Sequence, residues 1–410
     1  MIAICLLAVS TGIPIALTFD TLHNWLWEEG FSKTAIAALS ISTLPYVFKF
    51  FLGPIVDQVN IPFLHKIGRR KSWSLVSQVG MFLWIIVLAI YPMDASLGDT
   101  LFILFFISLC SAFNQAALNA YRVESTPLEQ AGISSAMGAL GYRLGKLIAG
   151  AGALLLSTIV PWSTVYICMG SILLVSIFTV LSVDEPSFIP KNPEIPTSEK
   201  MGKWLQKKLV QPFADFIDRF PEWKMIIFFI VIYNIGDFLI YGMTNVFFRE
   251  IGFTKLEIAN ITKAFGLICT LLGGFLGGVM AHRMDMKKIL IWGVLVHCLS
   301  HISLFALAYF GNNIYMLYAS VILEHVTEGV KTAALVSFLT SLCSSTYFTA
   351  SQYAFFSSVK VMSRPILTSI SGSFVDFYGW FFFFGVGTIL SLFPLLFTHK
   401  LTMLKSRDLQ

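Results

Sequence analysis

The sequence has few charged residues. Asp, Glu, Lys and Arg make up only 12% of its 410 residues, whereas an ordinary globular chain carries roughly a quarter. Hydrophobic residues make up 56%, and 38 residues are Phe. A chain of this composition has too little polar surface for water, so we predict an all-α protein that spans the lipid bilayer. The same scarcity of charge excludes a soluble enzyme, a nucleic-acid-binding protein and a disordered chain.

The sequence also lacks the motifs of enzymes and metal sites. Its six cysteines lie far apart within apolar runs, which excludes a disulfide framework and a zinc cluster. The Gly-Lys pair at 145–146 does not complete a phosphate-binding loop, because Leu140 and Leu147 stand at two of the defining positions. His297 and His301 lie four residues apart in an apolar run, and we interpret them as packing residues. We predict no enzymatic activity, no cofactor and no bound metal.

Twelve apolar runs reach the length of about 20 residues that a membrane-spanning helix needs. They cover residues 2–27, 33–56, 72–91, 98–122, 130–157, 162–183, 224–248, 255–281, 288–310, 313–341, 346–371 and 377–398. The first run has neither a basic leader nor a cleavage site, so we expect a span rather than a removable signal. We predict a six-helix bundle at 1–183, a cytoplasmic linker at 184–223, and a second six-helix bundle with a short cytoplasmic tail at 224–410.

Part of the linker has the pattern of an amphipathic helix. From Glu199 to Phe220, apolar residues recur at helical spacing, with lysines and aspartates between them. This pattern favours a helix that lies in the membrane interface and is bent or broken at Pro212. A plain tether explains the same residues without a helix.

The basic residues outside the runs indicate the orientation. If both termini are cytoplasmic, the cytoplasmic loops and tail carry seventeen Lys and Arg. The opposite loops then carry only Lys33, Arg249 and Lys255. Because positive loops stay inside, we predict that both termini are cytoplasmic.

Twelve charged residues remain at membrane depth. They are Lys49, Arg122, Arg143, Lys146, Lys263, Lys331, Lys360, Arg364, Asp20, Asp237, Glu324 and Glu328. Each would cost at least about 2.5–3.5 kcal/mol at the centre of a lipid-facing helix. We therefore predict that they line a hydrated cavity, where eight basic against four acidic residues favour an anionic substrate. Arg122 lies close enough to a run's end that snorkelling to the interface is an alternative.

These charges and several glycines indicate how the helices are arranged. The third, sixth, ninth and twelfth runs carry none of the twelve charges, which indicates a duplicated six-helix unit. Glycines four residues apart predict close helix packing, as at 141 and 145, 273 and 277, and 274 and 278.

A loop after the second run resembles the signature loop of the major facilitator superfamily. Gly53-Pro-Ile-Val-Asp57 is followed by Gly68-Arg-Arg-Lys71, after a longer gap than the signature has. Asp57 can accept from the N-terminus of a facing helix and pair with an arginine, whereas positive-inside anchoring alone also explains the arginines. We predict a cytoplasmic gate. Its residues are Gly53, Asp57, Gly68, Arg69, Arg70, Arg122 and Glu124.

An ordered series of further motifs is similar to the AmpG-type muropeptide permeases of that superfamily. It includes Gly12-Ile-Pro-Ile-Ala-Leu-Thr18, Tyr46-Val-Phe-Lys-Phe50, Gly141-Tyr-Arg-Leu-Gly145, Gly236-Asp237, Lys263, Glu324, Ser351-Gln-Tyr-Ala354 and Arg364. The resemblance implies twelve transmembrane helices in two six-helix halves around a central cavity, working as a monomer. It also implies proton-driven import of anhydro-muropeptides, the fragments of cell-wall turnover, across the inner membrane.

The substrate-binding candidates combine basic side chains for carboxylates with polar ones for sugar hydroxyls. They are Tyr46, Lys49, Asn119, Arg143, Lys146, Lys263, Gln352, Tyr353, Lys360 and Arg364. The chain departs from the family at Gln115 and Asn119, where Asp is usual, and at Glu328 and Lys331, where small residues are usual. These departures favour, as an alternative, a related permease for another large anion, CoA-linked or phosphorylated. A lipid flippase or membrane enzyme is a more distant alternative.

Proton coupling requires a carboxylate whose proton affinity changes as the cavity alternates between states. The candidates are Asp237, Glu324, Glu328 and Asp20, of which the first two match the family. The alternative is that each is a fixed ion-pair partner, such as Glu328 with Lys331 one helical turn away.

Overall fold

The computed structural model describes residues 1–59, 61, 62, 64, 67–92, 96–126, 131–185, 211–343 and 349–398, and these contain helices but no β-strand. By their contacts they form two compact units. The first unit is Met1–Gly30 with Ser42–Leu205, and the second is Phe31–Ile41 with Gln206–Gln410. The all-α prediction is therefore confirmed for the described residues.

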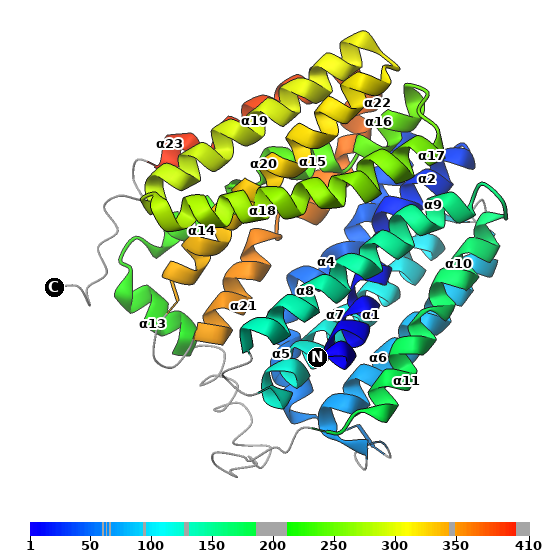
Figure 1. Ribbon diagram of the computed structural model, residues 1–410, viewed down its shortest axis with the longest axis vertical. Coiled ribbons are helices and arrows are strands. Elements are labelled where there is room, and N and C mark those ends of the chain that lie inside the picture. The colour runs from blue at the N-terminus through cyan, green and yellow to red at the C-terminus, as the bar shows by residue number, and fades with distance from the viewer. Residues whose placement is uncertain are drawn as a thin grey trace. The chain divides into compact units, whose positions relative to one another are not determined.

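The first unit holds the helices of the first six predicted runs (Figure 1). They are α1 (Ile2–Ile15), η1 (Ala16–Asp20), α2 (Thr21–Glu28), α4 (Leu44–Val47), α5 (Lys49–Gln58), α6 (Arg69–Ile90), α7 (Leu97–Ser125), α8 (Ala131–Leu147), η5 (Ile148–Gly152), α9 (Ala153–Leu156), α10 (Trp162–Ser171) and α11 (Leu173–Ser182). The 3₁₀-helix η2 (Leu39–Thr43) enters this unit from the second.

Glycines let α1 and α8 pack closely. A Cβ atom at Gly12 would collide with the carbonyl of Tyr142, and one at Gly141 would collide with the carbonyl of Cys5. The close approach predicted from the glycine spacing on α8 is therefore confirmed. It brings α1 and α8 side by side (Figure 1).

The second unit holds the helices of the last six runs and one helix from the second run. They are α3 (Lys33–Ala38), α13 (Gln211–Arg219), α14 (Trp223–Ile232), α15 (Ile235–Tyr241), α16 (Thr244–Glu250), α17 (Lys255–Glu257), η7 (Ile258–Phe265), α18 (Gly266–Arg283), α19 (Met286–Phe310), α20 (Ile314–Ser341), α21 (Thr349–Lys360), α22 (Arg364–Leu392) and α23 (Leu395–Thr398). Helices α18 and α19 both pack on α20, and α15 and α19 both pack on α22.

Only one of the two glycine pairs on α18 makes a close contact. A Cβ atom at Gly273 would collide with the carbonyl of Val326 on α20, and Gly277 also faces α20. A Cβ atom added at Gly274 or at Gly278 would have nothing within 4 Å among the described residues. The prediction of close packing is therefore confirmed for the first pair and wrong, within the described residues, for the second.

Helix α3 is anchored on α22 of the second unit. The backbone amide and hydroxyl of Thr34 both donate to Asp376 Oδ2, at 3.1 and 2.7 Å. Lys33 Nζ lies 2.9 Å from Glu250 and 3.9 Å from Asp376. Gly372 lies against the carbonyl of Lys33, where a side chain would not fit. A short piece of the second predicted run thus packs as part of the second unit.

Each predicted run coincides with helix, and nine segments of the described chain are long and apolar enough to cross a membrane. Helix α20 has 28 residues but carries Glu324, Glu328 and Lys331 in its middle. The second run is interrupted by η2 and by the non-helical Phe48. Parts of the eleventh and twelfth runs lie in one helix, α22, which is broken at Gly379, where φ is 76°. The count of twelve spans stays a prediction.

Three helices contain π-helical segments near predicted membrane charges. Asp20 ends η1, which follows Pro14 inside the first span. Lys146 lies two residues before η5, and Lys263 lies within η7. Because π-helical turns interrupt the regular hydrogen-bond ladder and occur at functional sites, these segments mark places where the helices depart from simple packing.

The described part of the linker is helix α13. Phe216 of α13 and Phe220, directly after the helix, are buried, and the Phe216 ring meets the Phe356 ring of α21 with centroids 4.9 Å apart. The apolar side of α13 therefore packs on protein rather than on lipid. Pro212 lies in the first turn of α13, where proline is compatible with a helix. Residues 199–210 and the tail at 399–410 lie outside the described residues.

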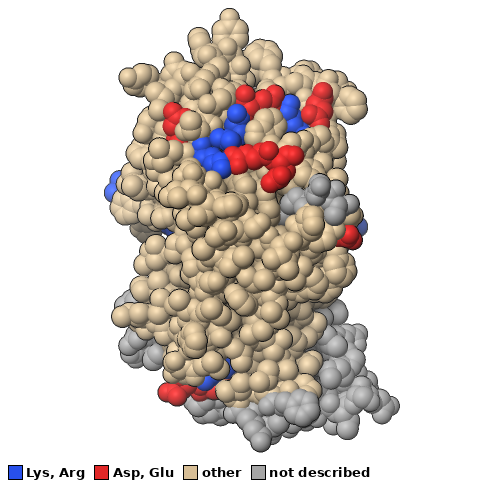
Figure 2. Space-filling model, turned by 90° about the vertical axis from the view of Figure 1, so that its right-hand side faces the viewer, with Lys and Arg blue, Asp and Glu red and all other residues tan. Residues whose placement is uncertain are grey.

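One face of the molecule has the charge distribution of a membrane protein. Figure 2 shows charged side chains gathered toward two ends of this face, with a broad uncharged band between them. Since a lipid-facing charge is costly, such a band is what a bilayer requires.

Candidate functional site

A buried ion pair joins α15 and α20 in the second unit. Lys331 Nζ donates to Asp237 Oδ2 at 2.6 Å. The Lys331 side chain is 3% exposed and the Asp237 side chain 20% exposed. The ammonium also lies 5.3 Å from the centre of the Tyr233 ring. The alternative pairing of Lys331 with Glu328 is therefore corrected: Glu328 is exposed, whereas Lys331 points to a carboxylate 94 residues away.

Two imidazoles from α19 reach the other oxygen of the same carboxylate. His297 Nε2 lies 3.4 Å and His301 Nε2 lies 3.6 Å from Asp237 Oδ1. Their rings lie 4.9 Å apart and are nearly perpendicular. The interpretation of this pair as packing residues is therefore incomplete, since both rings face a charged group.

Hydroxyl groups from two further helices contact the outer nitrogens of the imidazoles. Thr327 Oγ1 of α20 lies 2.8 Å from His297 Nδ1, and Ser391 Oγ of α22 lies 3.0 Å from His301 Nδ1. Ser391 Oγ also lies 3.5 Å from Asp237 Oδ1. Four helices thus converge on one polar cluster, which we call the charged junction: Asp237, His297, His301, Thr327, Lys331 and Ser391.

The charged junction also has the ligand types of a metal site. One ligand atom each of Asp237, His297 and His301 lie within 4.8 Å of one another. However, the Lys331 ammonium already compensates the carboxylate, and a divalent cation would enter against that like charge. We therefore assign no metal to the charged junction.

The first unit has a polar cluster at the matching helices, built from neutral residues. Asn114 on α7 donates to Ser10 Oγ on α1 at 2.9 Å and accepts from Ser74 Oγ on α6 at 2.9 Å. Gln78 of α6 donates to Ser74 at 3.0 Å and also contacts Asn114 and Ser10. All four are buried. We call Ser10, Ser74, Gln78 and Asn114 the neutral junction.

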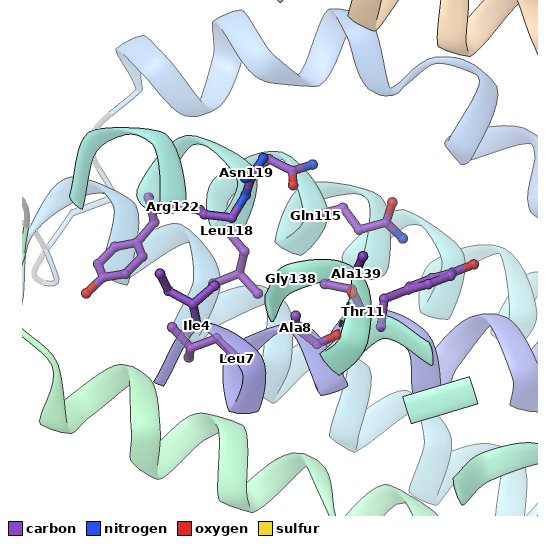
Figure 3. Close-up of a pocket in the computed structure, with 12 residues that line it drawn as sticks. Ile4, Leu7, Ala8, Thr11, Gln115, Leu118, Asn119, Arg122, Gly138 and Ala139 are labelled. Atoms are coloured by element: carbon purple, nitrogen blue, oxygen red, sulfur yellow. Dashed lines mark hydrogen bonds between the residues drawn. The ribbon is translucent and has the colours of Figure 1, made fainter. Parts of the chain in front are cut away.

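A cavity of about 280 Å³ opens beside the neutral junction, between α1, α7 and α8. Gln115, Asn119 and Arg122 follow one another along α7 at this cavity, with Ile4, Ala8 and Thr11 of α1 among the other lining residues (Figure 3). Amide and guanidinium groups on a wall of apolar and hydroxyl-bearing residues can hold a polar or anionic ligand. Asn119 is therefore placed at a cavity, as a binding residue must be.

The predicted gate residues partly come together. Arg70 donates to Glu124 from Nε at 3.0 Å and from Nη2 at 2.5 Å, and Arg69 lies 3.7 Å from Glu124. Glu185 accepts from the amides of Arg70 and Lys71 at the start of α6 and lies against Gly68, whose φ is 111°. This ties the ends of α6, α7 and α11 within one unit.

Two gate residues lie elsewhere, and one is outside the described side chains. Arg122 lines the cavity of the first unit. A Cβ atom added at Gly53 would have nothing within 4 Å among the described residues, so no close helix contact there depends on this glycine. The side chain of Asp57 lies outside the described part of the chain. The gate stays a prediction.

The other binding candidates are spread over several helices. Tyr46, Lys49, Arg143, Lys146, Lys263, Lys360 and Arg364 are all half-buried, and Tyr353 is 36% exposed. The Arg364 guanidinium lies 5.1 Å from the centre of the Tyr241 ring. Gln352 is buried, and its amide donates to Asp215 and accepts from Arg219 of α13. It holds the linker helix to α21, so we leave it out of the binding set proposed below.

The remaining proton-coupling candidates differ in their burial. Asp20 is buried in η1, Glu324 is half-buried, and Glu328 is exposed. Asp237 is surrounded by basic groups from two helices, α19 and α20. Sequence reasoning missed the roles of Lys331, Thr327 and Ser391, because their partners are far away in the chain. The four-residue spacing of His297 and His301 was the available signal for a shared face.

Comparison with known proteins identifies the class. Residues 1–268 match the family model of the Major Facilitator Superfamily. The chain is 32% identical over 397 residues to the AmpG 4 transporter of Rickettsia conorii, covering 96% of this chain and 94% of that protein. It is 30% identical over 403 residues to the anhydromuropeptide permease of Escherichia coli K12, covering 97% and 79%.

Solved structures show the same fold at low sequence identity. A bacterial homologue of the human lysosomal transporter Spinster, inward-facing and occupied, matches with a TM-score of 0.73 at 12% identity, covering 98% of this chain and 96% of that one. A D-xylose–proton symporter matches with a TM-score of 0.70 at 12% identity, covering 99% and 97%.

The all-helical fold and these likenesses define a multi-pass membrane protein that works as a secondary transporter and not as an enzyme. The chain belongs to the major facilitator superfamily and, within it, to the AmpG-type permeases.

Proposed function

We propose that this transporter imports anhydro-muropeptides together with protons across the bacterial inner membrane. The observation that carries the proposal is the similarity over nearly the whole chain to a protein named anhydromuropeptide permease. The composition of the membrane-depth residues supports it, since eight basic side chains against four acidic ones suit an anionic ligand. We further propose that the protein works as a monomer and that both termini are cytoplasmic, because the basic loops lie on that side.

The proposed binding set contains basic residues for carboxylates and polar residues for sugar hydroxyls. It comprises Tyr46, Lys49, Asn119, Arg143, Lys146, Lys263, Tyr353, Lys360 and Arg364. Asn119 is supported by its place at the cavity of the first unit. Asp237 and Glu324 are the carboxylates proposed to take part in proton coupling, and Asp237 is the better supported because three basic groups face it.

A transport assay tests the proposal. A permease-deficient bacterium that expresses this chain should accumulate labelled anhydro-muropeptide, and a protonophore should abolish the accumulation. No uptake by a correctly inserted protein would contradict the proposed substrate. Uptake that the protonophore leaves unchanged would contradict the coupling.

Charge-neutral variants test the binding set in the same assay. Lys49→Gln, Arg143→Gln and Lys263→Gln should each lower uptake by about tenfold or more, because each loses a hydrogen bond to a charged group. Lys288→Gln is the matched control, since Lys288 is 67% exposed and pairs only with Asp285 among the described residues. Normal uptake by all three variants would contradict the assignment.

One observation favours a second candidate substrate class. The cavity of the first unit presents Gln115, Asn119 and Arg122, with no carboxylate among its lining residues. AmpG-type sequences usually have Asp at the first two of these positions, so this cavity is better suited to a more strongly anionic ligand. A CoA-linked or phosphorylated metabolite is therefore the alternative cargo, to be tested if anhydro-muropeptide is not transported.

A further inference from the structure

The charged junction can bind one proton in addition to the proton that the Lys331 ammonium carries. With both imidazoles neutral, Asp237 and Lys331 cancel each other's charge. One added proton makes the cluster cationic. The two imidazoles are 4% and 3% exposed, whereas Asp237 is 20% exposed, so the cluster is reached from its carboxylate side.

The contacts of His297 suit both of its protonation states. When His297 is neutral, the single hydroxyl hydrogen of Thr327 can donate to Nδ1 at 2.8 Å while Nε2–H faces Asp237. When His297 is protonated, Nδ1–H donates to Thr327 Oγ1, and the hydroxyl turns to the carbonyl of Leu323 at 2.5 Å. Rotation of one hydroxyl therefore accommodates the proton, and no heavy atom has to move.

His301 has the same arrangement with a different helix. Ser391 Oγ can donate to His301 Nδ1 at 3.0 Å, or it can accept from Nδ1–H while donating to the carbonyl of Gly387 at 3.0 Å. In each imidazole, Nε2 thus faces the shared carboxylate. Nδ1 contacts a hydroxyl that can either donate or accept the hydrogen bond.

The surroundings limit the pair to one proton. The imidazoles face Asp237 of α15 with Nε2 and the hydroxyls of Thr327 and Ser391 with Nδ1. The other titratable groups lie around the ion pair: Lys331 on the second oxygen of Asp237, Tyr233 beside Lys331, and Cys298 near both charges. Among the described residues, no second carboxylate lies within 4 Å of either imidazole. Two imidazolium rings 4.9 Å apart beside an ammonium would be balanced by a single negative charge, so the second proton is opposed by like charges.

The neutral junction shows that packing does not require these charges. Ser74 and Gln78 lie four residues apart on α6, as His297 and His301 do on α19. The first unit satisfies most of its buried polar atoms there with amides and hydroxyls, and among the described residues only Gln78 Oε1 of this junction has no hydrogen-bond partner. Because burying ionisable groups is costly, a cluster that keeps them where a neutral one would pack has a use for their charge.

We propose that His297 and His301 form the proton-binding site of this transporter, and that Asp237 stays ionised. A hydronium ion of the solvent gives its proton to the unprotonated Nδ1 of one imidazole, which leaves water and an imidazolium, and the hydroxyl of Thr327 or Ser391 turns from donor to acceptor. This inference rests on the proposed proton-coupled transport and names the groups that carry the proton. The added positive charge favours binding of an anionic substrate, and loss of the proton removes that attraction.

A titration of the imidazoles tests the inference without any substrate. The chain has only seven histidines, so ¹⁵N-histidine NMR of the purified full-length protein in nanodiscs resolves them, with His297→Gln and His301→Gln to assign the pair. We expect the pair to take up one proton in a single step as the pH falls. His282→Gln, which removes an exposed imidazole, should leave that step unchanged.

A variant that removes one of the reversing hydroxyls makes the titration test more specific. Thr327→Val should move the midpoint of the His297 step by about one pH unit or more, because it removes the reversing partner. Thr340→Val is the matched control, since Thr340 on the same helix bonds only its own backbone at Val336 among the described residues. A pair that does not titrate, or a proton found on Asp237 by its ¹³C carboxyl signal, would overturn the inference.

Transport measurements separate this inference from the proposed function. The double variant His297→Gln/His301→Gln, checked for correct membrane insertion, should lose active accumulation, so that its ratio of inside to outside anhydro-muropeptide falls to about one. Normal accumulation by the double variant would overturn the inference and leave the proposed function standing. If the unmodified protein shows no protonophore-sensitive accumulation, the proposed function fails, and the NMR titration alone decides whether the imidazoles bind the proton.

Discussion

The neutral junction and the charged junction lie in different units but on helices of corresponding order among the predicted spans. Ser10, the pair Ser74 and Gln78, and Asn114 belong to the first, third and fourth predicted spans. Asp237, the histidine pair and Lys331 belong to the seventh, ninth and tenth. Helices of the same predicted order thus bring together uncharged groups in the first unit and ionisable groups in the second.

The difference teaches which part of a buried polar cluster is structural. Both junctions satisfy most of their polar atoms by contacts between three or more helices. In a low-dielectric interior such networks fix the position of the helices, whatever their charge. A neutral network is enough for that, so the ion pair and imidazoles of the second repeat are an addition whose benefit must lie in function.

Breaking the ion pair should have the largest effect on stability. Lys331→Met or Asp237→Asn alone leaves one buried charge without its partner and should lower the free energy of unfolding by about 3–5 kcal/mol. The double variant removes both charges and should recover most of this loss. Thermal unfolding of the purified protein in detergent measures the change.

An exposed lysine–aspartate pair provides the control for this experiment. Lys288 lies 2.9 Å from Asp285, and the two side chains are 67% and 74% exposed. Asp285→Asn should change the stability by only about 0–1 kcal/mol, because water screens the pair. Equal losses at the buried and exposed pairs would contradict the contrast between the two junctions.

A packing change should have an intermediate effect and should act alike in both repeats. Gly273→Ala places a methyl group against the carbonyl of Val326, and Gly141→Ala places one against the carbonyl of Cys5. Each should cost about 1–3 kcal/mol, as overpacked sites do. Gly274→Ala is the matched control, because nothing lies within 4 Å of its Cβ position. A loss at Gly274 as large as at Gly273 would rule out the contact as the cause.

Removing the central amide of the neutral junction should have the smallest effect. Asn114→Ala should cost about 1 kcal/mol, because its hydrogen bonds are lost but the hydroxyl of Ser10 keeps its bond to the carbonyl of Leu7. The pH dependence of transport should not change. Urea or thermal unfolding measures the first, and uptake between acidic and neutral pH measures the second. A shifted pH profile would show that the neutral junction also takes part in coupling.

The helices followed from the sequence because a bilayer imposes a minimum apolar length. The third, fourth and tenth predicted runs match α6, α7 and α20 within a few residues. The break at Phe48 was not predicted, and the break between the eleventh and twelfth runs was expected at 372–376 but lies at Gly379, since neither residue differs in hydropathy from its helical neighbours in a decisive way.

The site was harder to predict than the helices because its contacts join distant parts of the chain. The sequence singles out Asp237, but the pairing it suggests for Lys331, as an alternative only, is with Glu328, the nearest carboxylate on the same helix, and not with Asp237. Only the fold brings α15, α19, α20 and α22 together. Gln352 is the opposite case. It lies in a family motif and was predicted to bind substrate, but its amide donates to Asp215 of the linker helix α13.

The anchoring of α3 has a consequence for dividing the protein into fragments. A cut in the linker gives two pieces of six predicted spans each, but the first piece carries α3, whose Thr34 and Lys33 bind Asp376 and Glu250 of the second. The second fragment therefore lacks one of its own packing elements. The two halves are not interchangeable modules, and a chimera that exchanges the second half between relatives has to exchange residues 31–41 with it.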